Sequence, residues 1–206
     1  MQEEVLGIIQ ARTGSERLPR KMLCKIGNHK IIEWVIKRAK RIKNINKLIL
    51  STSNLNDDKV LIEIAKINKI NTFIGSENDV LKRFYDTAKF YKKNIIVRLP
   101  ADNPFIDPNL IDILIKKFDY HKYDYSNNII DFMKSNYVDG FGAEIFTLDL
   151  MKKILNNTAN KDYREHVTLY VKDHPSKFKI QKNIAPKELS YPELKFDVDT
   201  LYDLKK

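Results

Sequence analysis

Near its start the chain reads Val5-Leu6-Gly7-Ile8-Ile9-Gln10-Ala11-Arg12-Thr13-Gly14-Ser15-Glu16-Arg17-Leu18-Pro19-Arg20-Lys21. The apolar run over 5–10 predicts a buried strand, and the polar stretch after it predicts a loop with a turn at Gly14-Ser15. The loop carries four cations, which are Arg12, Arg17, Arg20 and Lys21. Ligands of open α/β sheets bind outside the carboxyl ends of strands, where Arg and Lys can hold phosphate oxygens. The stretch matches neither the P-loop nor the dinucleotide-binding pattern, so it predicts a polyphosphate-binding loop of another kind.

The rest of the first half continues as alternating strands and helices. Strands are expected at 48–51, 71–74 and 95–99, and helices at 30–43, from Asp57 or Asp58 to about 68, and at 80–91. The second half is less regular, with strands expected at 123–127, 143–146, 178–183 and 195–198, and helices at 108–118, 148–156 and 162–172. The β-α-β alternation predicts an α/β fold with a mainly parallel central sheet and right-handed crossovers.

The composition predicts one globular domain over residues 1–206. The chain is 43% hydrophobic and 31% charged, which supports a sizeable core and argues against disorder. No run approaches the roughly 18 apolar residues of a membrane helix, and the acidic start argues against a signal peptide. The single cysteine, Cys24, excludes an internal disulfide and is compatible with a reducing cytoplasm, where we expect the protein to reside.

The net charge of +10 is concentrated in the first half of the chain. Residues 1–100 hold 21 Lys and Arg against 10 Asp and Glu, whereas residues 101–206 hold 16 against 17. This asymmetry predicts that the first half meets an anion, either a nucleotide or a nucleic acid. Much of the excess lies on the helix expected at 30–43, where a solvated basic face is the favoured interpretation.

Two further segments carry carboxylates that could join the cationic loop. Asp102 follows the strand at 95–99, where it could bind a metal or substrate or could form an ordinary Asp-Asn-Pro turn. Further along, alternation of apolar and acidic residues places Asp197 and Asp199 on one face of a strand. One or both could hold Mg²⁺ with Asp102, or Asp199 could cap a helix that begins directly after it.

The second half contains two more candidate segments with two interpretations each. In Arg164-Glu165-His166, the imidazole of His166 could act as a general acid or base, or it could be structural. The glycine-containing bend at 139–144 ends at Glu144 and could shape a substrate pocket or form a simple turn.

Five blocks of the sequence, taken in order, resemble one enzyme family. They are Ile8-Ile9-Gln10-Ala11-Arg12-x-Gly14-Ser15-x-Arg17-Leu18-Pro19-x-Lys21, Gly75-Ser76-Glu77-x-Asp79-Val80-Leu81-x-Arg83-Phe84, Arg98-x-x-Ala101-Asp102-Asn103-Pro104-x-Ile106-Asp107-Pro108, Arg164-Glu165-His166-Val167-Thr168 and Val198-Asp199-Thr200. Together they are similar to the sugar-activating cytidylyltransferases, above all to the type named for spore-coat polysaccharide biosynthesis. That type is related to the acylneuraminate and 3-deoxy-manno-octulosonate cytidylyltransferases.

The resemblance implies a Rossmann-like nucleotidyltransferase fold with a smaller β-containing part for the acceptor and for dimerisation. It divides the single domain into a nucleotide-binding half, 1–107, and an acceptor half, 108–206, and it implies a homodimer formed through 126–147. It also implies CTP as donor, a small sugar or sugar-like acceptor, and Mg²⁺ as cofactor. No nucleic-acid partner and no membrane partner are expected.

The resemblance further implies roles for individual residues. Catalysis is assigned to Arg12, Lys21 and Asp102, and Mg²⁺ binding to Asp102 and Asp199. Nucleotide binding is assigned to Ala11, Arg12, Gly14, Ser15, Arg17, Lys21, Ser76, Asp79 and Arg83. Acceptor binding is assigned to Asn103, Glu144, Glu165 and His166.

The sequence also departs from the family pattern. Arg20 stands where a glycine is usual, and it could add a phosphate contact or face solvent. Val138 and Gly142 stand where a proline and an acidic residue are expected, which leaves the identity of the acceptor open. The helix expected after Asp199 is short, which suggests an abbreviated C-terminus.

The reaction that the resemblance implies is attack of an acceptor oxygen on the α-phosphorus of CTP with loss of pyrophosphate. Two alternatives remain from the sequence. One is a glycosyltransferase that uses an existing nucleotide-sugar and has a similar fold. The other is a non-enzymatic nucleic-acid-binding protein, which the net charge suggests but for which aromatic residues interleaved with the basic face are lacking.

Overall fold

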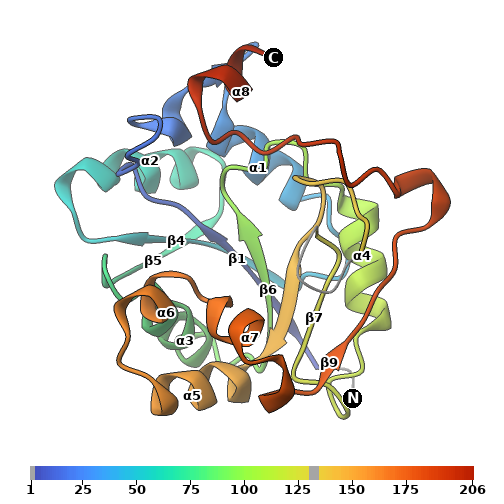
Figure 1. The fold of residues 1–206 in the computed structure, drawn as a ribbon. Helices are drawn as coiled ribbons and strands as arrows, with labels where there is room; N and C mark the ends of the chain where they lie inside the picture. Colours follow the sequence, from blue (N-terminus) through green and yellow to red (C-terminus); the bar gives the residue numbers. More distant parts are fainter. Residues whose placement is uncertain (1–2, 130–134) are drawn as a thin grey trace.

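The computed structural model describes residues 3–129 and 135–206. Within them, the strands of the central sheet lie in the order β5-β4-β1-β6-β8-β7-β9 (Figure 1). Their bounds are β1 (Val5–Gln10), β4 (Lys47–Ser53), β5 (Asn71–Gly75), β6 (Ile95–Pro100), β7 (Tyr125–Asn127), β8 (Glu144–Thr147) and β9 (Ile180–Gln181). The first four strands of the chain in this sheet run parallel, β8 lies antiparallel between β6 and β7, and β9 is parallel to β7. The predicted α/β fold with a mainly parallel sheet is confirmed.

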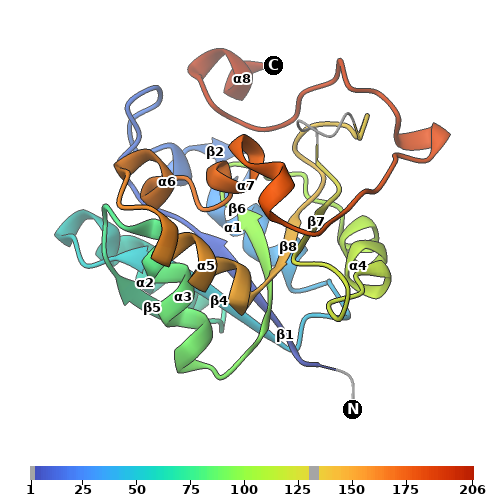
Figure 2. The same cartoon turned by 60° about the horizontal axis from the view of Figure 1, so that its bottom comes forward.

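Helices cover both faces of the sheet because successive side chains of β1 point to opposite sides. Val5 and Ile9 pack in one hydrophobic cluster with α1 (Ile31–Ala39), α2 (Lys59–Ile67) and α4 (Pro108–Lys117). Leu6 and Ile8 pack in a second cluster with α3 (Val80–Phe90), α5 (Leu148–Asn157) and α7 (Leu169–Asp173). Figure 2 shows α3 and α5 side by side on their face of the sheet. The fold thus has three layers, and the loops at the carboxyl ends of β1 and β6 are left uncovered by helices.

The remaining elements are short. They are the hairpin β2 (Lys25–Ile26) and β3 (His29–Lys30), the helices α6 (Lys161–Glu165) and α8 (Leu201–Lys205), and the 3₁₀ helices η1 (Lys21–Leu23), η2 (Asn56–Asp58), η3 (Pro175–Lys177) and η4 (Lys187–Leu189). Among the described residues, no helix combines the length and the apolar character that crossing a bilayer requires.

Two predicted elements of the second half are wrong. The helix expected over 162–172 is interrupted after Glu165, so that α6 and α7 are separate helices. The strand expected over 195–198 is reduced to a single bridge between Lys195 and Asp139. In the second case, pairing with the distant Asp139 limits the segment to one bridge.

The tail of the chain is held against the rest of the fold by backbone hydrogen bonds. The N–H of Phe196 donates to the carbonyl of Asp139 at 3.1 Å, and the N–H of Val198 donates to the carbonyl of Asp102 at 2.9 Å. Gly140 has a φ of +91°, and a Cβ there would lie 2.7 Å from the backbone nitrogen of Asp197. A side chain at position 140 would therefore push away the segment that carries Asp199.

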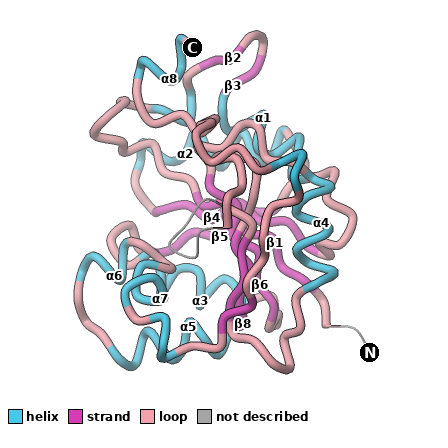
Figure 3. The backbone as a smooth tube through the Cα atoms, turned by 45° about the vertical axis from the view of Figure 1, so that its right-hand side comes forward, coloured by secondary structure: helices cyan, strands magenta, loops and turns pink. Residues whose placement is uncertain are grey.

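Beyond this contact, α8 lies beside the β2–β3 hairpin (Figure 3). The buried side chains between them are Leu18, Ile31 and Val198, and Cys24, Ile26 and Leu204 pack around these. This small apolar cluster joins the cationic loop, the hairpin and the tail.

Candidate active site

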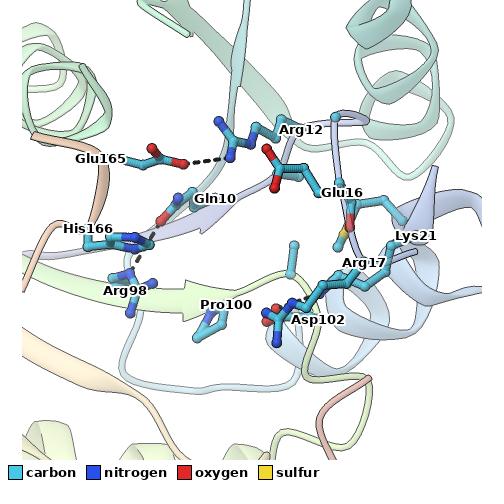
Figure 4. Close-up of a pocket in the computed structure, with 15 residues that line it drawn as sticks. Gln10, Arg12, Glu16, Arg17, Lys21, Arg98, Pro100, Asp102, Glu165 and His166 are labelled. Atoms are coloured by element: carbon cyan, nitrogen blue, oxygen red, sulfur yellow. Dashed lines mark hydrogen bonds and ion pairs between the residues drawn. The ribbon is translucent and has the colours of Figure 1, made fainter. Parts of the chain in front are cut away.

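A cleft of about 490 Å³ opens where β1 and β6 end (Figure 4). Residues from three distant segments line it, and these are Gln10, Ala11, Arg12, Gly14, Ser15, Glu16, Arg17, Lys21, Met22, Arg98, Pro100, Ala101, Asp102, Glu165 and His166. The structure therefore brings the cationic loop together with Asp102 and with the Glu165-His166 pair. This is the edge of a parallel sheet at which α/β proteins bind their ligands.

At one end of the cleft, the ammonium group of Lys21 lies between two carboxylates. Its Nζ donates to Oδ2 of Asp102 and to Oδ1 of Asp199, at 3.0 Å in each case. The Lys21 side chain is 8% exposed, and those of Asp102 and Asp199 are 32% and 14% exposed. Two carboxylates that are 97 positions apart thus converge on one point, as the sequence blocks predicted.

Two further cations face Asp199. Arg17 binds it with both terminal nitrogens at 2.9 Å, and Nζ of Lys195 lies 3.5 Å away. Burial on its own would raise the pKa of Asp199, but the hydrogen bond and charge of Lys21 and the charge of Arg17 lower it below the ordinary value. The carboxylate is therefore ionised at neutral pH.

The donor set of Asp102 and Asp199 fits a hard divalent cation. Among the described residues, no three His, Cys, Asp or Glu side chains are grouped so that they alone could hold a metal ion. Mg²⁺ takes one or two carboxylates and completes its shell with waters and phosphate oxygens, so two carboxylates beside a phosphate-binding loop suffice.

Asp197, the other aspartate of the alternating stretch, lies apart from this pair. It forms an ion pair with Lys195 at 3.4 Å, and one of its oxygens has no hydrogen-bond partner among the described residues. Burial and the neighbouring charge of Asp139 raise the pKa of Asp197 to about 6. Of the two candidates, only Asp199 faces Asp102 across Lys21.

On the opposite side of the cleft, Arg12 binds the carboxylate of Glu165 at 2.6 Å. The two residues are 153 positions apart, and both side chains are about two-fifths exposed. His166 follows at the point where α6 ends, so the interruption of the predicted helix turns its imidazole toward the cleft (Figure 4).

Arg98 lines the cleft but was not among the residues predicted for the site. Its Nε donates to Oε1 of Gln10 at 3.3 Å, and its Nη1 forms an ion pair with the fully buried Glu144. The carboxylate of Glu144 also accepts a hydrogen bond of 2.6 Å from the hydroxyl of Tyr125. The structure thus places Glu144 behind Arg98 and not on the cleft surface. The signal for Arg98 in the sequence was a single charge within an otherwise apolar strand.

The second sequence block, at 75–84, lies behind the cleft. Asp79 caps α3 by accepting from the N–H of Lys82 at 2.9 Å and binds Arg164 at 3.1 Å, which ties α3 to α6. Arg83 is 1% exposed and donates from Nη1 to the carbonyl of Ser76 at 2.7 Å. Burial lowers the pKa of Arg83 to about 10, and its Nε and Nη2 have no hydrogen-bond partner among the described residues. None of these three predicted residues lines the cleft.

Two other residues singled out in the sequence lie outside the cleft. Asn103 is buried directly after Asp102, outside the lining of the cleft. Arg20 is exposed and has a φ of +55°, a left-handed conformation that explains why glycine is usual there.

Asp58 fixes the cationic loop, a role that sequence reasoning missed. It occupies the N-cap position of α2 but makes no side-chain cap bond. Instead, its Oδ1 accepts from both the backbone N–H and the hydroxyl of Thr13 at 2.7 Å, and its Oδ2 accepts from Ser53. Burial would raise the pKa of Asp58, but these hydrogen bonds lower it below 3.8.

Replacing Asp58 with alanine is expected to reduce the free energy of unfolding by about 2–3 kcal/mol at pH 7, because buried donors lose their acceptor. Since the native pKa is depressed, the contribution of the ionised carboxylate is complete above the unfolded value and is lost as the pH falls through the native pKa. Urea unfolding of both proteins at pH 7 and at pH 3 measures this difference, which should shrink at pH 3. The exposed neighbour provides the control, and Asp57→Ala should stay within about 0.5 kcal/mol of the parent. Equal losses for the two variants would contradict this role.

Comparison with known proteins shows which family this chain resembles. A family model described as cytidylyltransferase matches residues 6–205. The uncharacterized protein MJ1063 of Methanocaldococcus jannaschii is 36% identical, over 98% of this chain and 81% of that protein. The spore coat polysaccharide biosynthesis protein SpsF of Bacillus subtilis is 33% identical, over 97% of this chain and 83% of that protein. The solved structure of a cytidylyltransferase from Leptospira borgpetersenii superposes with a TM-score of 0.89 at 32% identity, covering 98% of this chain and 84% of that one.

Proposed function

The chain belongs to the cytidylyltransferase family and is a nucleotidyltransferase, and we propose that it transfers CMP from CTP to a sugar or sugar-like acceptor with release of pyrophosphate. One observation carries this proposal. Lys21 holds Asp102 and Asp199 together, and Arg12 and Arg17 of the same loop line the same cleft. Such a site can bind a triphosphate and a divalent cation next to each other.

In this proposal the loop residues bind and orient the triphosphate. Arg12, Arg17 and Lys21 contact phosphate oxygens and stabilise the charge that develops on pyrophosphate as it leaves. Ala11, Gly14 and Ser15 line the cleft and allow the backbone to approach the nucleotide. Asp102 and Asp199 would hold Mg²⁺, which when bound polarises the α-phosphate and offsets its charge.

The remaining predicted residues divide between the base and the acceptor. We assign Ser76, Asp79 and Arg83 to the nucleoside end, where they act from behind the cleft: Asp79 ties α3 to α6 through Arg164, and Arg83 holds the carbonyl of Ser76. Asn103, Glu165 and His166 are assigned to the acceptor, and Glu144 acts there through Arg98. The acceptor belongs to surface polysaccharide or glycoconjugate synthesis, an assignment that rests on the likeness to SpsF. CTP use implies a cytoplasmic reaction, which the single cysteine suits.

We also propose that the protein is a homodimer with one domain per chain, divided functionally at residue 107. Part of the segment assigned to dimerisation, 130–134, lies outside the described residues. Sedimentation equilibrium of the purified protein tests the homodimer, and a monomer mass would contradict it.

Among the four nucleoside triphosphates, CTP with Mg²⁺ is expected to raise the Tm most. At about 100 times its Kd, a ligand adds about 2.7 kcal/mol to the free energy of unfolding. For a chain of this size that corresponds to a rise of roughly 5–10 °C. The measurement is a thermal melt with ATP, GTP, UTP or CTP, each with Mg²⁺ or EDTA. An equal rise with UTP or ATP would contradict the choice of CTP, and pyrophosphate release with a panel of sugar acceptors would then separate nucleotidyl transfer from glycosyl transfer.

A further inference from the structure

The position of Lys21 has a consequence for the order in which ligands bind. Its ammonium group, nearly excluded from solvent, makes hydrogen bonds of 3.0 Å to both Asp102 and Asp199. These are the two carboxylates that the proposed function assigns to a divalent cation, and the inference rests on that assignment. An ammonium group between them occupies the place that the cation needs.

The contacts of Asp199 also oppose a free cation, because its oxygens already have partners. Arg17 uses both terminal nitrogens on the two oxygens of Asp199, and Lys195 lies 3.5 Å from the same carboxylate. Three positive side chains therefore contact these two carboxylates, and one of them, Lys195, is shared with Asp197 at 3.4 Å. A divalent cation that approaches the free protein meets like charges and oxygens that already have partners.

A triphosphate removes this obstacle because it carries several negative charges. The lysine ammonium is a point charge on a flexible stem, so it can leave the carboxylates for a phosphate oxygen while its backbone stays in η1. Arg17, whose side chain is 66% exposed, can likewise move from Asp199 to a phosphate oxygen. The two carboxylates are then open toward the phosphates, where the cation finds both kinds of ligand.

We infer that Lys21 is a resident counter-ion that keeps divalent cations out of the free enzyme and admits them together with the nucleotide. Cation and nucleotide then bind with positive coupling, and each raises the affinity of the other by the same factor. The free enzyme is thereby prevented from taking up a cation that would hold the carboxylates in a state without substrate.

The test is a titration with Mn²⁺, followed by the electron paramagnetic resonance signal of the free ion, with and without CTP. Solutions of CTP without protein provide the blank, since the nucleotide binds Mn²⁺ itself. In the absence of CTP, Lys21→Met is expected to bind Mn²⁺ at least about tenfold more tightly than the parent, a coupling within the usual range. Arg20→Met is the matched control, because it removes the same charge from the adjacent, exposed position and should leave Mn²⁺ affinity near that of the parent.

Two additional variants keep the test decisive. Asp102→Asn in the Lys21→Met background should abolish the gain, which places the bound ion at these carboxylates. Circular dichroism checks the fold, and if Lys21→Met does not fold, Arg17→Met at the exposed position should show a smaller gain of the same sign.

The outcomes separate this inference from the function on which it rests. Suppose that Lys21→Met binds Mn²⁺ no more tightly than the parent without CTP, while both proteins still bind Mn²⁺ in the presence of CTP. This result would overturn the counter-ion role and leave the proposed function standing. Tight Mn²⁺ binding by the free parent protein would overturn it as well. Absence of Mn²⁺ binding in every variant even with CTP would overturn both.

Discussion

Asp102→Asn is expected to lower the turnover of CTP at least a hundredfold while the protein stays folded. The substitution keeps the shape of the side chain but removes the charge that faces Lys21 and Asp199. Loss of one well-placed charge contact at a reacting phosphate costs about 2–4 kcal/mol in the barrier. The effect on stability should be small, at most about 1 kcal/mol, because the Asp102 side chain is one-third exposed and its ion pair is partly solvated.

Pyrophosphate release at saturating CTP measures this effect, and urea unfolding shows whether the fold is retained. Asp86→Asn is the matched control, since Asp86 carries the same charge in an exposed ion pair with Lys82 on α3. Its turnover should stay within a factor of two or so of the parent. An Asp102→Asn enzyme that keeps a tenth or more of the parent turnover would remove Asp102 from the mechanism.

Glu144→Ala is expected to reduce the free energy of unfolding by about 3–5 kcal/mol, because it leaves the guanidinium of Arg98 inside the protein without its counter-charge. Glu144 is fully buried, and three-quarters or more of the Arg98 side chain is shielded as well. Burial would raise the pKa of Glu144, but the charges of Arg98 and Lys172 lower it, so the pair is ionised at neutral pH. The penalty should shrink in acid, as the parent carboxylate is protonated.

A second variant, Arg98→Met/Glu144→Met, shows whether Glu144→Ala loses stability through the unpaired charge or through lost packing. When both charges are replaced by apolar side chains, most of the lost stability should return, because no unpaired charge remains. The doubly substituted protein should nevertheless lose turnover, since Arg98 lines the cleft. Urea unfolding at pH 7 supplies the comparison, and a double variant no more stable than Glu144→Ala would show that the cost comes from lost volume.

The parts of the structure that depend on local pattern were predictable from the sequence. The strand at 5–10, the cationic loop after it and the helix that begins at Pro108 follow from periodicity and turn chemistry. The convergence of Asp102 and Asp199 was predictable only through resemblance to a family. Nothing in the residues between them specifies that contact.

The missed features depend on tertiary partners. Asp58 was expected at a helix start, and it stands there, but its carboxylate binds Thr13 at a distance of 45 positions in the chain. Alternation predicted a strand near 197, whereas that segment follows the rim of the cleft and has a single bridge to Asp139. In both cases the deciding partner is distant in the sequence, which a local rule does not include.

The apolar cluster beneath α8 gives this protein a built-in reporter. Cys24, the one thiol in the sequence, is half-buried there beside Val198 and Leu204, close to the residue that supplies the second carboxylate. Because Val198 and Leu204 pack around this thiol, movement of the tail away from the hairpin should expose it further. A ligand that holds the tail in place is therefore expected to slow labelling of Cys24 in the unmodified enzyme.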